Sequence, residues 1–507
     1  MGSARAQPAD PERPDLLGRV MSGLVWKLAS QGLAQALSMI SIVLLARLLT
    51  PRQFGIAAMA EVASAFVISY SDGGLGLALV QRETVTEADC STVFWSSAAL
   101  GATMAAICVG VAPLAAAFYH TSEVRPLLDV LSLSFLLTGL GSTHRSLQVR
   151  SMNFRVLEIR TMAAGVAAAA VTIAIALLGG GPWAIIIGDV TGAAVSTALL
   201  LALGGWRPSL VFRWRSLREL GPFGLRFVGG VTFMTLNTNA DNVLVGRVLG
   251  QAALGVYSLA YSVILVPLSR LAAPIHQLLS PAFARMQSDT PGLAANWVRA
   301  TRLLLLVFAP LMLTVTATAP DLVRLLFGRR WDAAVPIIRV LAPVCALLSI
   351  QGVADAAVQA VGRMKIYLRM SALSFALNLV AFVVGVRFGL LGMAVGLGIS
   401  TLTFMTIYLA LVARMLGTPI SSLPSAFAGV LLAAIALLIA EETVYRLCEA
   451  AATPWPVRIA ATVCTGLAAF LLVCVARERD TLSDALRLLS MRLPVSRRLI
   501  PRALQAH

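Results

Sequence analysis

Long apolar segments recur along this chain and constrain its fold more than any other feature. Fourteen stretches between residues 22 and 476 are each apolar over about the 20 residues that a helix needs to cross a bilayer. The composition agrees, because 58% apolar and 13% charged residues lie well outside the range of soluble globular proteins. The sequence therefore predicts an all-α integral membrane protein with about fourteen transmembrane helices.

One helix-turn-helix segment occurs twice in the chain. Residues 37–61 align with residues 237–261, so that Gly55 of the first copy matches Gly255 of the second. In each copy we expect an apolar helix to end at an Arg, turn within about six residues and restart near the Gly. Six predicted helices precede the second copy, and because six is even, both copies enter the membrane from the same side. The sequence thus predicts two parallel six-helix lobes, with two extra helices at the C-terminus.

The predicted spans divide the chain into parts with different environments. We expect a cytoplasmic N-terminal segment (1–21), an N-lobe (22–205), a cytoplasmic inter-lobe linker (206–222), a C-lobe (223–414), two extra helices (425–476) and a basic amphipathic cytoplasmic tail (477–507). A translocation site is expected between the two lobes.

Positive charge is distributed unevenly over the predicted topology. The net charge is +16, and with a cytoplasmic N-terminus about two thirds of the 40 Lys and Arg fall on cytoplasmic segments. Arg285 belongs to that majority, whereas Arg52, Arg329 and Arg446 fall on the extracytoplasmic side. We therefore expect both termini in the cytoplasm and basic segments that face anionic lipid, with no nucleic-acid partner.

Two connecting segments have compositions that suggest contact with the membrane surface. Residues 327–341 hold Trp331 among charged residues, which is typical of an interfacial anchor. The connection after the fourth predicted helix is basic, and its spacing predicts a bent amphipathic linker, or more simply a solvated loop. Its arginines recur every five residues: Arg145, Arg150, Arg155 and Arg160.

Polar side chains form a stripe along the first predicted helix. Lys27, Gln31 and Gln35 are four residues apart, a spacing that places them on one helical face. Polar side chains in hydrocarbon usually face the interior of a bundle, so this stripe is a candidate cavity wall. The alternative is that Lys27 reaches the headgroups and the glutamines bond neighbouring helices.

The seventh and eighth predicted helices carry further polar groups. Arg226, Asn237 and Asp241 fall on one face of the seventh, and Asn239 adds to the polar run. We interpret them as part of a polar translocation cavity, with a buried structural hydrogen-bond network as the alternative. The eighth helix contains Arg270 between two prolines. Its simplest interpretation is an ion pair with Asp241 or Asp355.

A helix break is expected at Asp72, Gly73 and Gly74, because two adjacent glycines and an Asp disfavour a helix by roughly 2 kcal/mol. The break is either a packing kink or a hinge near the cytoplasmic gate.

The sequence offers no sign of catalysis or of a bound cofactor. The six Cys residues lack metal-ligand or paired spacing, and the four His residues have no nucleophile or carboxylate at useful spacing. No Gly-rich loop followed by Lys-Ser or Lys-Thr occurs, which excludes direct ATP use through such a loop. We expect a transporter rather than an enzyme, with no cofactor and no metal. Either an ion gradient or downstream polymerisation gives the transport its direction.

Five motifs occur in a characteristic order: ARLLTPRQFGIAAMA, DGGLGLALVQRETVTEADCSTVFW, RSLQVRSMNF, GRVLGQAALGVYSLAYSVILVPLSR and LLFGRRWDAAVPIIRVLAP. Together they resemble the polysaccharide transporter family, specifically its Wzx-type lipid-linked oligosaccharide flippases of the exopolysaccharide-exporting branch in the MOP flippase superfamily. The resemblance covers about residues 18–480.

This resemblance implies a MATE-like MOP fold, alternating access and a place in the bacterial inner membrane. It implies undecaprenyl-diphosphate-linked oligosaccharide as cargo, held by a cationic cavity onto which we map Lys27, Arg226 and Arg270. It also implies H⁺ or Na⁺ coupling through cavity acids, for which Asp241 is the first candidate and Asp355 the second. A polysaccharide polymerase and other assembly proteins are the expected protein partners.

Three other classes of protein remain to be weighed against this one. An ion-coupled multidrug or small-molecule antiporter of the same superfamily would share the fold. A membrane polymerase or acyltransferase would need the catalytic groups that the sequence lacks. A scaffold without transport activity would not need polar side chains at the bilayer midplane.

Overall fold

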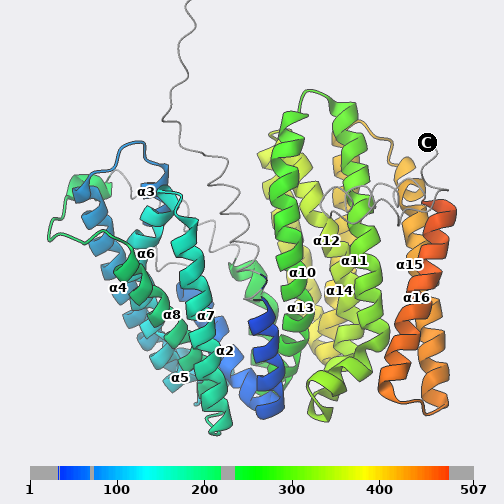
Figure 1. Cartoon of the computed structure of the whole chain (residues 1–507), viewed down its shortest axis with the longest axis horizontal. Coiled ribbons are helices and arrows are strands. Elements are labelled where there is room, and N and C mark those ends of the chain that lie inside the picture. The colour runs from blue at the N-terminus through cyan, green and yellow to red at the C-terminus, as the bar shows by residue number, and fades with distance from the viewer. Residues whose placement is uncertain (1–31, 33–34, 69–73, 219–234, 479–507) are drawn as a thin grey trace, which may run out of the picture. The chain divides into compact units, whose positions relative to one another are not determined.

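The computed structural model describes residues 32, 35–68, 74–218 and 235–478, leaving aside the side chains of 66–68 and 266–278. Within these residues every regular element is a helix (Figure 1), which confirms the all-α prediction. Nine helical stretches in the described part are long and apolar enough to cross a membrane. Each of the fourteen predicted segments contains helical residues, and the total number of spans stays a prediction.

The described chain separates into two compact units. One contains the residues up to Leu49 together with Ile56–Asn239, and the other contains Thr50–Gly55 and the residues from Ala240 onward. The short segment Thr50–Gly55 thus belongs to the second unit although the rest of its helix belongs to the first.

In the first unit α4 packs on α6, and α8 packs on both α6 and α7. The start of α4 is fixed by a capping box, in which Thr86 and Asp89 each accept a hydrogen bond from the other's backbone N–H. The helices of this unit are α2 (Pro51–Ile68, from Ile56), α3 (Leu75–Gln81), α4 (Glu87–Tyr119), α5 (Val124–Leu131), α6 (Leu133–Arg150), α7 (Phe154–Leu177) and α8 (Trp183–Leu203).

In the second unit α12 packs on α10, α11 and α14, while α15 and α16 lie side by side against α11 (Figure 1). A helical stretch over 235–244 leads into it and continues as one turn of π-helix, η1 (Val245–Leu249). The remaining elements are α10 (Gln251–Arg285), α11 (Thr290–Leu326), η2 (Arg329–Ala334), α12 (Val335–Ala360), α13 (Met364–Gly385), η3 (Val386–Phe388), α14 (Gly389–Met415), α15 (Ser422–Ala450) and α16 (Trp455–Arg477).

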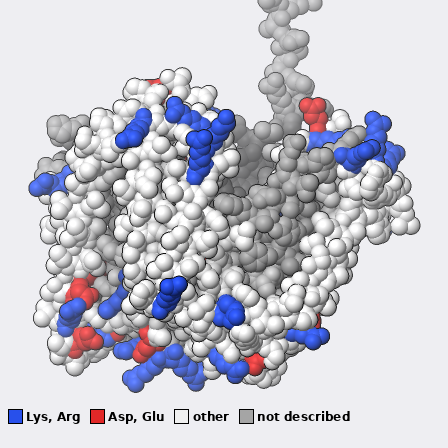
Figure 2. All heavy atoms as spheres, turned by 180° about the vertical axis from the view of Figure 1, so that it is seen from behind, with Lys and Arg blue, Asp and Glu red and all other residues white. Residues whose placement is uncertain are grey.

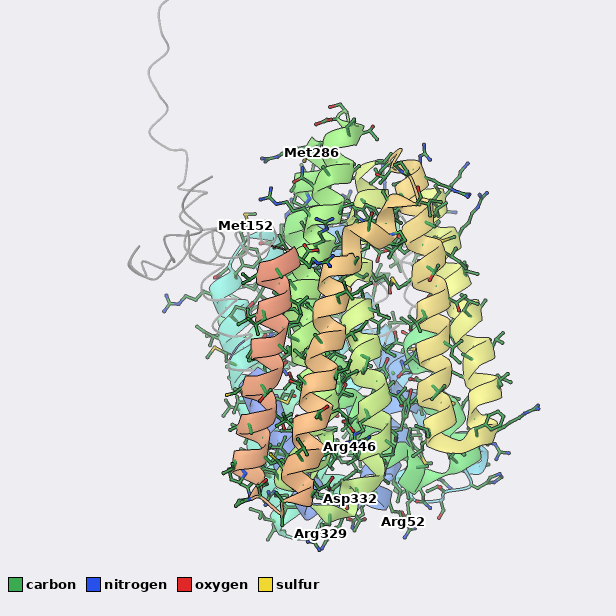
Figure 3. All side chains as sticks on the ribbon, turned by 90° about the vertical axis from the view of Figure 1, so that its right-hand side faces the viewer. Arg52, Met152, Met286, Arg329, Asp332 and Arg446 are labelled. Atoms are coloured by element: carbon green, nitrogen blue, oxygen red, sulfur yellow. The ribbon has the colours of Figure 1, made fainter. Side chains whose placement is uncertain are left out.

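Charged side chains collect at the ends of the helices. Figure 2 shows Lys and Arg at the two ends with an uncharged band between them, as expected for helices that cross a bilayer. In the second unit Met286 lies at one end, and Arg52, Arg329 and Arg446 lie at the opposite end (Figure 3). The sequence-based topology likewise placed Arg285, the neighbour of Met286, on the side opposite these three arginines. Which end faces the cytoplasm stays a prediction.

The connection after the fourth span is shorter than the predicted basic linker or loop. α6 continues to Arg150 and α7 begins at Phe154, so Arg145 and Arg150 lie on one helix and Arg155 on the next. Arg150 donates hydrogen bonds to the backbone carbonyls of Leu79 (3.1 Å), Val80, Arg82 and Glu83 (2.7 Å). This side chain satisfies the carbonyls at the C-terminal end of α3, which is a structural role rather than a surface one.

The predicted interfacial anchor at Trp331 is wrong. The Trp331 side chain has 0% exposure, and its ring packs edge-on against Phe54 with ring centroids 5.7 Å apart. Asp332 beside it pairs with Arg324 at 3.1 Å. An aromatic residue next to charged residues at a helix end was expected to face the headgroups, but here it fills the core of the second unit.

Both copies of the repeated segment turn more tightly than expected. In the first copy a helix over Gln35–Leu48 is followed at Pro51 by α2, and in the second copy α10 begins at Gln251. The two helix starts cross in close contact inside the second unit. A Cβ added at Gly55 would overlap the carbonyl oxygen of Gln251, and one added at Gly255 would overlap that of Pro51. Only glycine permits this approach of two backbones.

Part of the predicted inter-lobe linker packs onto the first unit. Trp206 and Leu217 pack against the apolar cluster that contains Leu75, Leu79 and Val93. Hydrogen bonds join the same segment to α4: Ser91 to Ser209 (2.8 Å), Trp95 Nε1 to Ser209 O (2.9 Å), Arg213 N to Thr92 (2.9 Å) and Ser216 to Asp89 (2.6 Å). Residues 206–217 are therefore anchored to the first unit.

Candidate functional site

Several of the predicted site residues lie outside the described part of the chain. This holds for the backbone and side chains of Lys27, Gln31, Asp72, Gly73 and Arg226. Arg270 lies in α10, but its side chain is not described. The cationic cavity and the ion pair of Arg270 with Asp241 or Asp355 therefore stay predictions.

The predicted helix break is present at Gly74. This residue is left-handed with φ 67° and precedes α3, which begins at Leu75. A left-handed residue cannot continue a right-handed helix, and glycine adopts this conformation without steric cost. The role of the break as a gate hinge stays a prediction.

The described amides of the predicted cavity include groups that lack partners. Within the described residues, both amide atoms of Gln35 and the Oδ1 atom of Asn237 are buried without a hydrogen-bond partner. Asn239 instead donates to the backbone oxygen of Thr235 at 3.0 Å. Buried amides are normally hydrogen-bonded, so Gln35 and Asn237 have the capacity to bind a polar group that enters the membrane interior.

Asp241 is a buried carboxylate held by two donors. The Tyr257 hydroxyl donates to its Oδ2 at 3.0 Å, and the backbone N–H of Asn242 donates to its Oδ1 at 2.7 Å. Asp241 is buried, with 2% of its surface exposed. The Tyr257 ring lies beside that of Tyr261, with centroids 5.9 Å apart. This arrangement supports the alternative of a structural network as well as it supports a cavity wall.

Asp355 shows a similar pairing on another helix. The Tyr408 hydroxyl on α14 donates to Oδ1 of Asp355 on α12 at 2.7 Å. Ser400, two turns earlier on α14, donates to Asn378 of α13 at 2.7 Å. Both predicted ion-coupling carboxylates thus accept a hydrogen bond from a tyrosine hydroxyl.

Three further acids inside the spans were missed in the sequence. Glu61 on α2 and Asp189 on α8 are exposed in the first unit and close enough to interact electrostatically. Glu441 on α15 has no exposed surface. Each is an ionisable residue within an apolar helix, which is itself a signal of function in membrane proteins. That signal alone would have identified all three.

The chain is a multi-pass membrane protein whose fold is that of MOP-superfamily transporters. Its structure matches that of lipid II flippase MurJ in an inward closed conformation with a TM-score of 0.73 and 14% identity, over 91% of this chain and 100% of that one. It matches an inward-facing multidrug resistance MATE transporter with a TM-score of 0.58 and 13% identity, over 76% of this chain and 94% of that one.

The chain belongs to the polysaccharide biosynthesis protein family, whose model matches residues 44–336, more than half of its length. It is 26% identical to the lipopolysaccharide biosynthesis protein WzxC of Escherichia coli, over 75% of this chain and 77% of that protein. It is 27% identical to the teichuronic acid biosynthesis protein TuaB of Bacillus subtilis, over 65% and 68%. It is 28% identical to the succinoglycan biosynthesis transport protein ExoT of Rhizobium meliloti, over 62% and 64%. The family resemblance in the sequence motifs is confirmed, and this family consists of transporters rather than enzymes.

Proposed function

We propose that this chain flips undecaprenyl-diphosphate-linked oligosaccharide repeat units from the cytoplasmic to the outer leaflet of the bacterial inner membrane. Its product serves exopolysaccharide or lipopolysaccharide biosynthesis. The observation that carries this proposal is the fold shared with a lipid II flippase over 91% of the chain, in a member of a polysaccharide biosynthesis family.

The alternative is an ion-coupled multidrug or small-molecule antiporter. The multidrug transporter fold covers 76% of the chain, whereas the lipid II flippase fold covers 91%. Relatives named for lipopolysaccharide, teichuronic acid and succinoglycan biosynthesis favour a saccharide cargo. A drug-resistance phenotype without any effect on polymer export would support the antiporter.

The chemistry of the cargo defines what the protein supplies. A diphosphate and its sugars cannot cross hydrocarbon unaided, whereas a polyprenyl tail need never leave it. The protein therefore shelters only the head group in a polar, cationic cleft. In this proposal Lys27, Arg226 and Arg270 hold the diphosphate. Gln35 and Asn237, whose amides include buried atoms without a described partner, bind sugar hydroxyls.

The test of this proposal is polymer export from a deletion strain that carries variants of the chain. Replacing Lys27 and Arg270 with Ala removes two charge-assisted contacts of about 1.5–3 kcal/mol each, so export is expected to fall more than tenfold. The variant protein should remain in the membrane, and lipid-linked repeat units should accumulate in the cytoplasmic leaflet. The matched control is Arg387→Ala, because Arg387 is an exposed cation in η3. Normal export by the double variant would contradict the proposal.

Alternating access is the mechanism we propose for this transfer. Because hydrogen bonds join residues 209–216 to α4, this segment moves with the first lobe in the proposed mechanism. A disulfide between cysteines introduced near Arg47 and near Arg247 is expected to form in one state and to stop export. Unimpaired export by the fully crosslinked protein would exclude a rocking motion.

Energy coupling is proposed to use H⁺ or Na⁺, with Asp241 and Asp355 as the candidate carboxylates. The test is flipping in proteoliposomes while the proton and sodium gradients are collapsed separately. Loss of gradient dependence in Asp241→Asn would support the assignment. Flipping that continues unchanged without either gradient would instead point to polymerisation as the driving force.

Topology and partners complete the proposal. Reporter fusions after residue 507 and before residue 1 should be active only in the cytoplasm, as the distribution of Lys and Arg over the connecting segments predicts. A polysaccharide polymerase and other assembly proteins are the proposed partners on the outer side, together with anionic lipids around the basic ends. Crosslinking in cells that make the polymer tests these contacts.

A further inference from the structure

The proposed function makes no use of a buried carboxyl group on α15 of the second unit. Glu441 of α15 has 0% exposure. It lies nine residues before the helix ends at Ala450, which is about 14 Å along the axis at 1.5 Å per residue. The carboxyl group is therefore inside the membrane-spanning part of α15, and it lies beyond the predicted C-lobe (223–414).

The surroundings of Glu441 are mainly apolar. α11, α15 and α16 meet in a buried cluster of apolar side chains: Leu306, Leu313, Ala433, Leu437, Phe470 and Cys474. Leu437 lies one turn before Glu441 on α15, so the carboxyl group adjoins this cluster. An ionised carboxylate is costly in such a place unless a cation or several donors compensate it.

Only half of the carboxyl group has a hydrogen-bond partner in the described part of the protein. The Thr314 hydroxyl of α11 donates to Oε1 at 2.6 Å, while Oε2 is buried without a partner. On the other side α16 passes directly against the group, because a Cβ added at Gly466 would overlap the Glu441 carboxyl. The carboxyl group is thus enclosed by α11 and α16.

A second unpartnered oxygen lies on α16, one helical turn from the residue that contacts Glu441. Thr462 has 0% exposure, and its Oγ1 is buried without a hydrogen-bond partner among the described residues. It lies one turn from Gly466, which contacts Glu441, and one turn from Arg458, whose guanidinium lies 5.2 Å from the ring centre of Tyr445. Glu441 and Tyr445 are one turn apart on α15. Thr462 therefore occupies the layer between them.

The cations of α15 and α16 nearest to Glu441 along these helices pair with other acids. Arg458 on α16 forms an ion pair with Asp321 on α11. On α15 itself, Arg446 pairs with Glu442 at 2.7 Å on the exposed side of the helix. In the part of the chain that the structure describes, no Lys or Arg pairs with Glu441.

We propose that Glu441 is a proton-binding site. In the neutral acid, Oε1 accepts from Thr314, and the O–H group on Oε2 can donate to Thr462 after a rotation of the side chains that brings the two unpartnered oxygens within hydrogen-bond distance. This inference is independent of the cargo. Loss of the proton leaves an anion beside the apolar cluster and weakens the packing of α15 and α16 on α11. The site thereby adds a proton-sensitive element outside the predicted coupling carboxylates.

Infrared spectroscopy of the full-length protein in lipid nanodiscs tests the protonation state directly. The carbonyl band of a neutral carboxylic acid should be present at neutral pH in the unmodified protein and absent from Glu441→Gln. The matched control is Glu442→Gln, because Glu442 is the neighbouring acid with 33% side-chain exposure and an ion pair. This control should keep the acid band and lose a carboxylate band. A carboxylate band lost from Glu441→Gln would overturn the proposal.

Thermal unfolding as a function of pH gives a second, independent test. Gln at position 441 has the shape of the neutral acid and can donate an N–H to Thr462. Glu441→Gln should therefore match the unmodified protein at low pH and lack its decrease in Tm as pH rises. The decrease should persist in Glu442→Gln. A Tm increase with Na⁺ over K⁺ that Glu441→Gln abolishes would identify a metal-cation site instead and overturn the proposal.

Thr462→Val keeps the proposal testable if Glu441→Gln does not fold. This substitution removes the acceptor of the acid O–H group and preserves side-chain volume. The acid band should shift to higher frequency, and the decrease in Tm should begin at lower pH. An unmoved acid band would show that Thr462 does not accept the proton of Glu441 and would refute the geometry.

Discussion

The two copies of the repeated segment, 37–61 and 237–261, have the same backbone contact and different chemistry. Gly55 and Gly255 occupy matching positions and face each other's helix start in the same way. The pair Asp241 and Tyr257, joined by a hydrogen bond of 3.0 Å, has no counterpart pair in the first copy, where Ser41 and Ala57 occupy the matching positions. The duplication therefore preserves a close helix contact, while the buried carboxylate–tyrosine pair is present in the second copy and not in the first.

Substitution of the shared glycines should have the largest effect on this comparison. In Gly55→Ala the new methyl group meets backbone atoms, which cannot rotate away, so we expect a loss of about 1–3 kcal/mol or more of stability. The same is expected for Gly255→Ala. Thermal unfolding in detergent measures the effect. The control is Gly110→Ala in α4, where an added Cβ meets nothing within 4 Å.

The double variant sharpens the test. A Cβ on either glycine separates the same two helix starts, so the second substitution should cost less than the first. Strictly additive losses in Gly55→Ala/Gly255→Ala would show that the two positions act independently and that the copies do not share one contact.

The polar pair of the second copy should have the next largest effect. Asp241→Ala leaves the buried Tyr257 hydroxyl without an acceptor, at a cost of about 1–3 kcal/mol. Tyr257→Phe should cost less, and adding it to Asp241→Ala should restore part of the stability. Ser41→Ala is the matched change in the first copy and should be close to neutral. Equal losses at Ser41 and Asp241 would remove the distinction between the copies.

The smallest effect is expected where the contact depends on side chains at the surface. The Gln251 side chain accepts a hydrogen bond from Arg52 at 3.2 Å in an exposed position. Gln251→Ala leaves the backbone carbonyl that faces Gly55 in place, so stability should change by less than about 0.5 kcal/mol. A loss as large as that of Gly55→Ala would mean that the side chain, rather than the backbone, holds the two helix starts together.

The sequence alone predicts the features that depend on local pattern. Apolar length indicates the helices, the 37–61 and 237–261 alignment indicates the duplication, and the glycines before Leu75 predict a break that the structure shows at Gly74. Each of these follows from neighbouring residues in the chain. The grouping of Arg52, Arg329 and Arg446 at one end of the second unit also follows from charge distribution.

Features that depend on distant residues were not predictable from one sequence. Arg150 resembles other arginines of a basic connection, and its role depends on carbonyls that lie 67 to 71 residues away. The sequence around Trp331 resembles an interfacial anchor, and only the structure shows that its ring packs against Phe54. Glu441 has its only described donor, Thr314, 127 residues away. The sequence shows an acidic residue within an apolar helix. It does not show that one carboxyl oxygen of Glu441 accepts a hydrogen bond while the other has no described partner.

The crossing of the two helix starts has a consequence for the origin of the chain. Pro51 faces Gly255 and Gln251 faces Gly55, which is the reciprocal pattern of an isologous dimer interface written within one polypeptide. A half-length ancestor would need a single glycine to satisfy both sides of such an interface. After fusion the two glycines of the interface are encoded separately. Gly55 and Gly255 must each stay small, because a glycine at one position does not make room for a larger residue at the other.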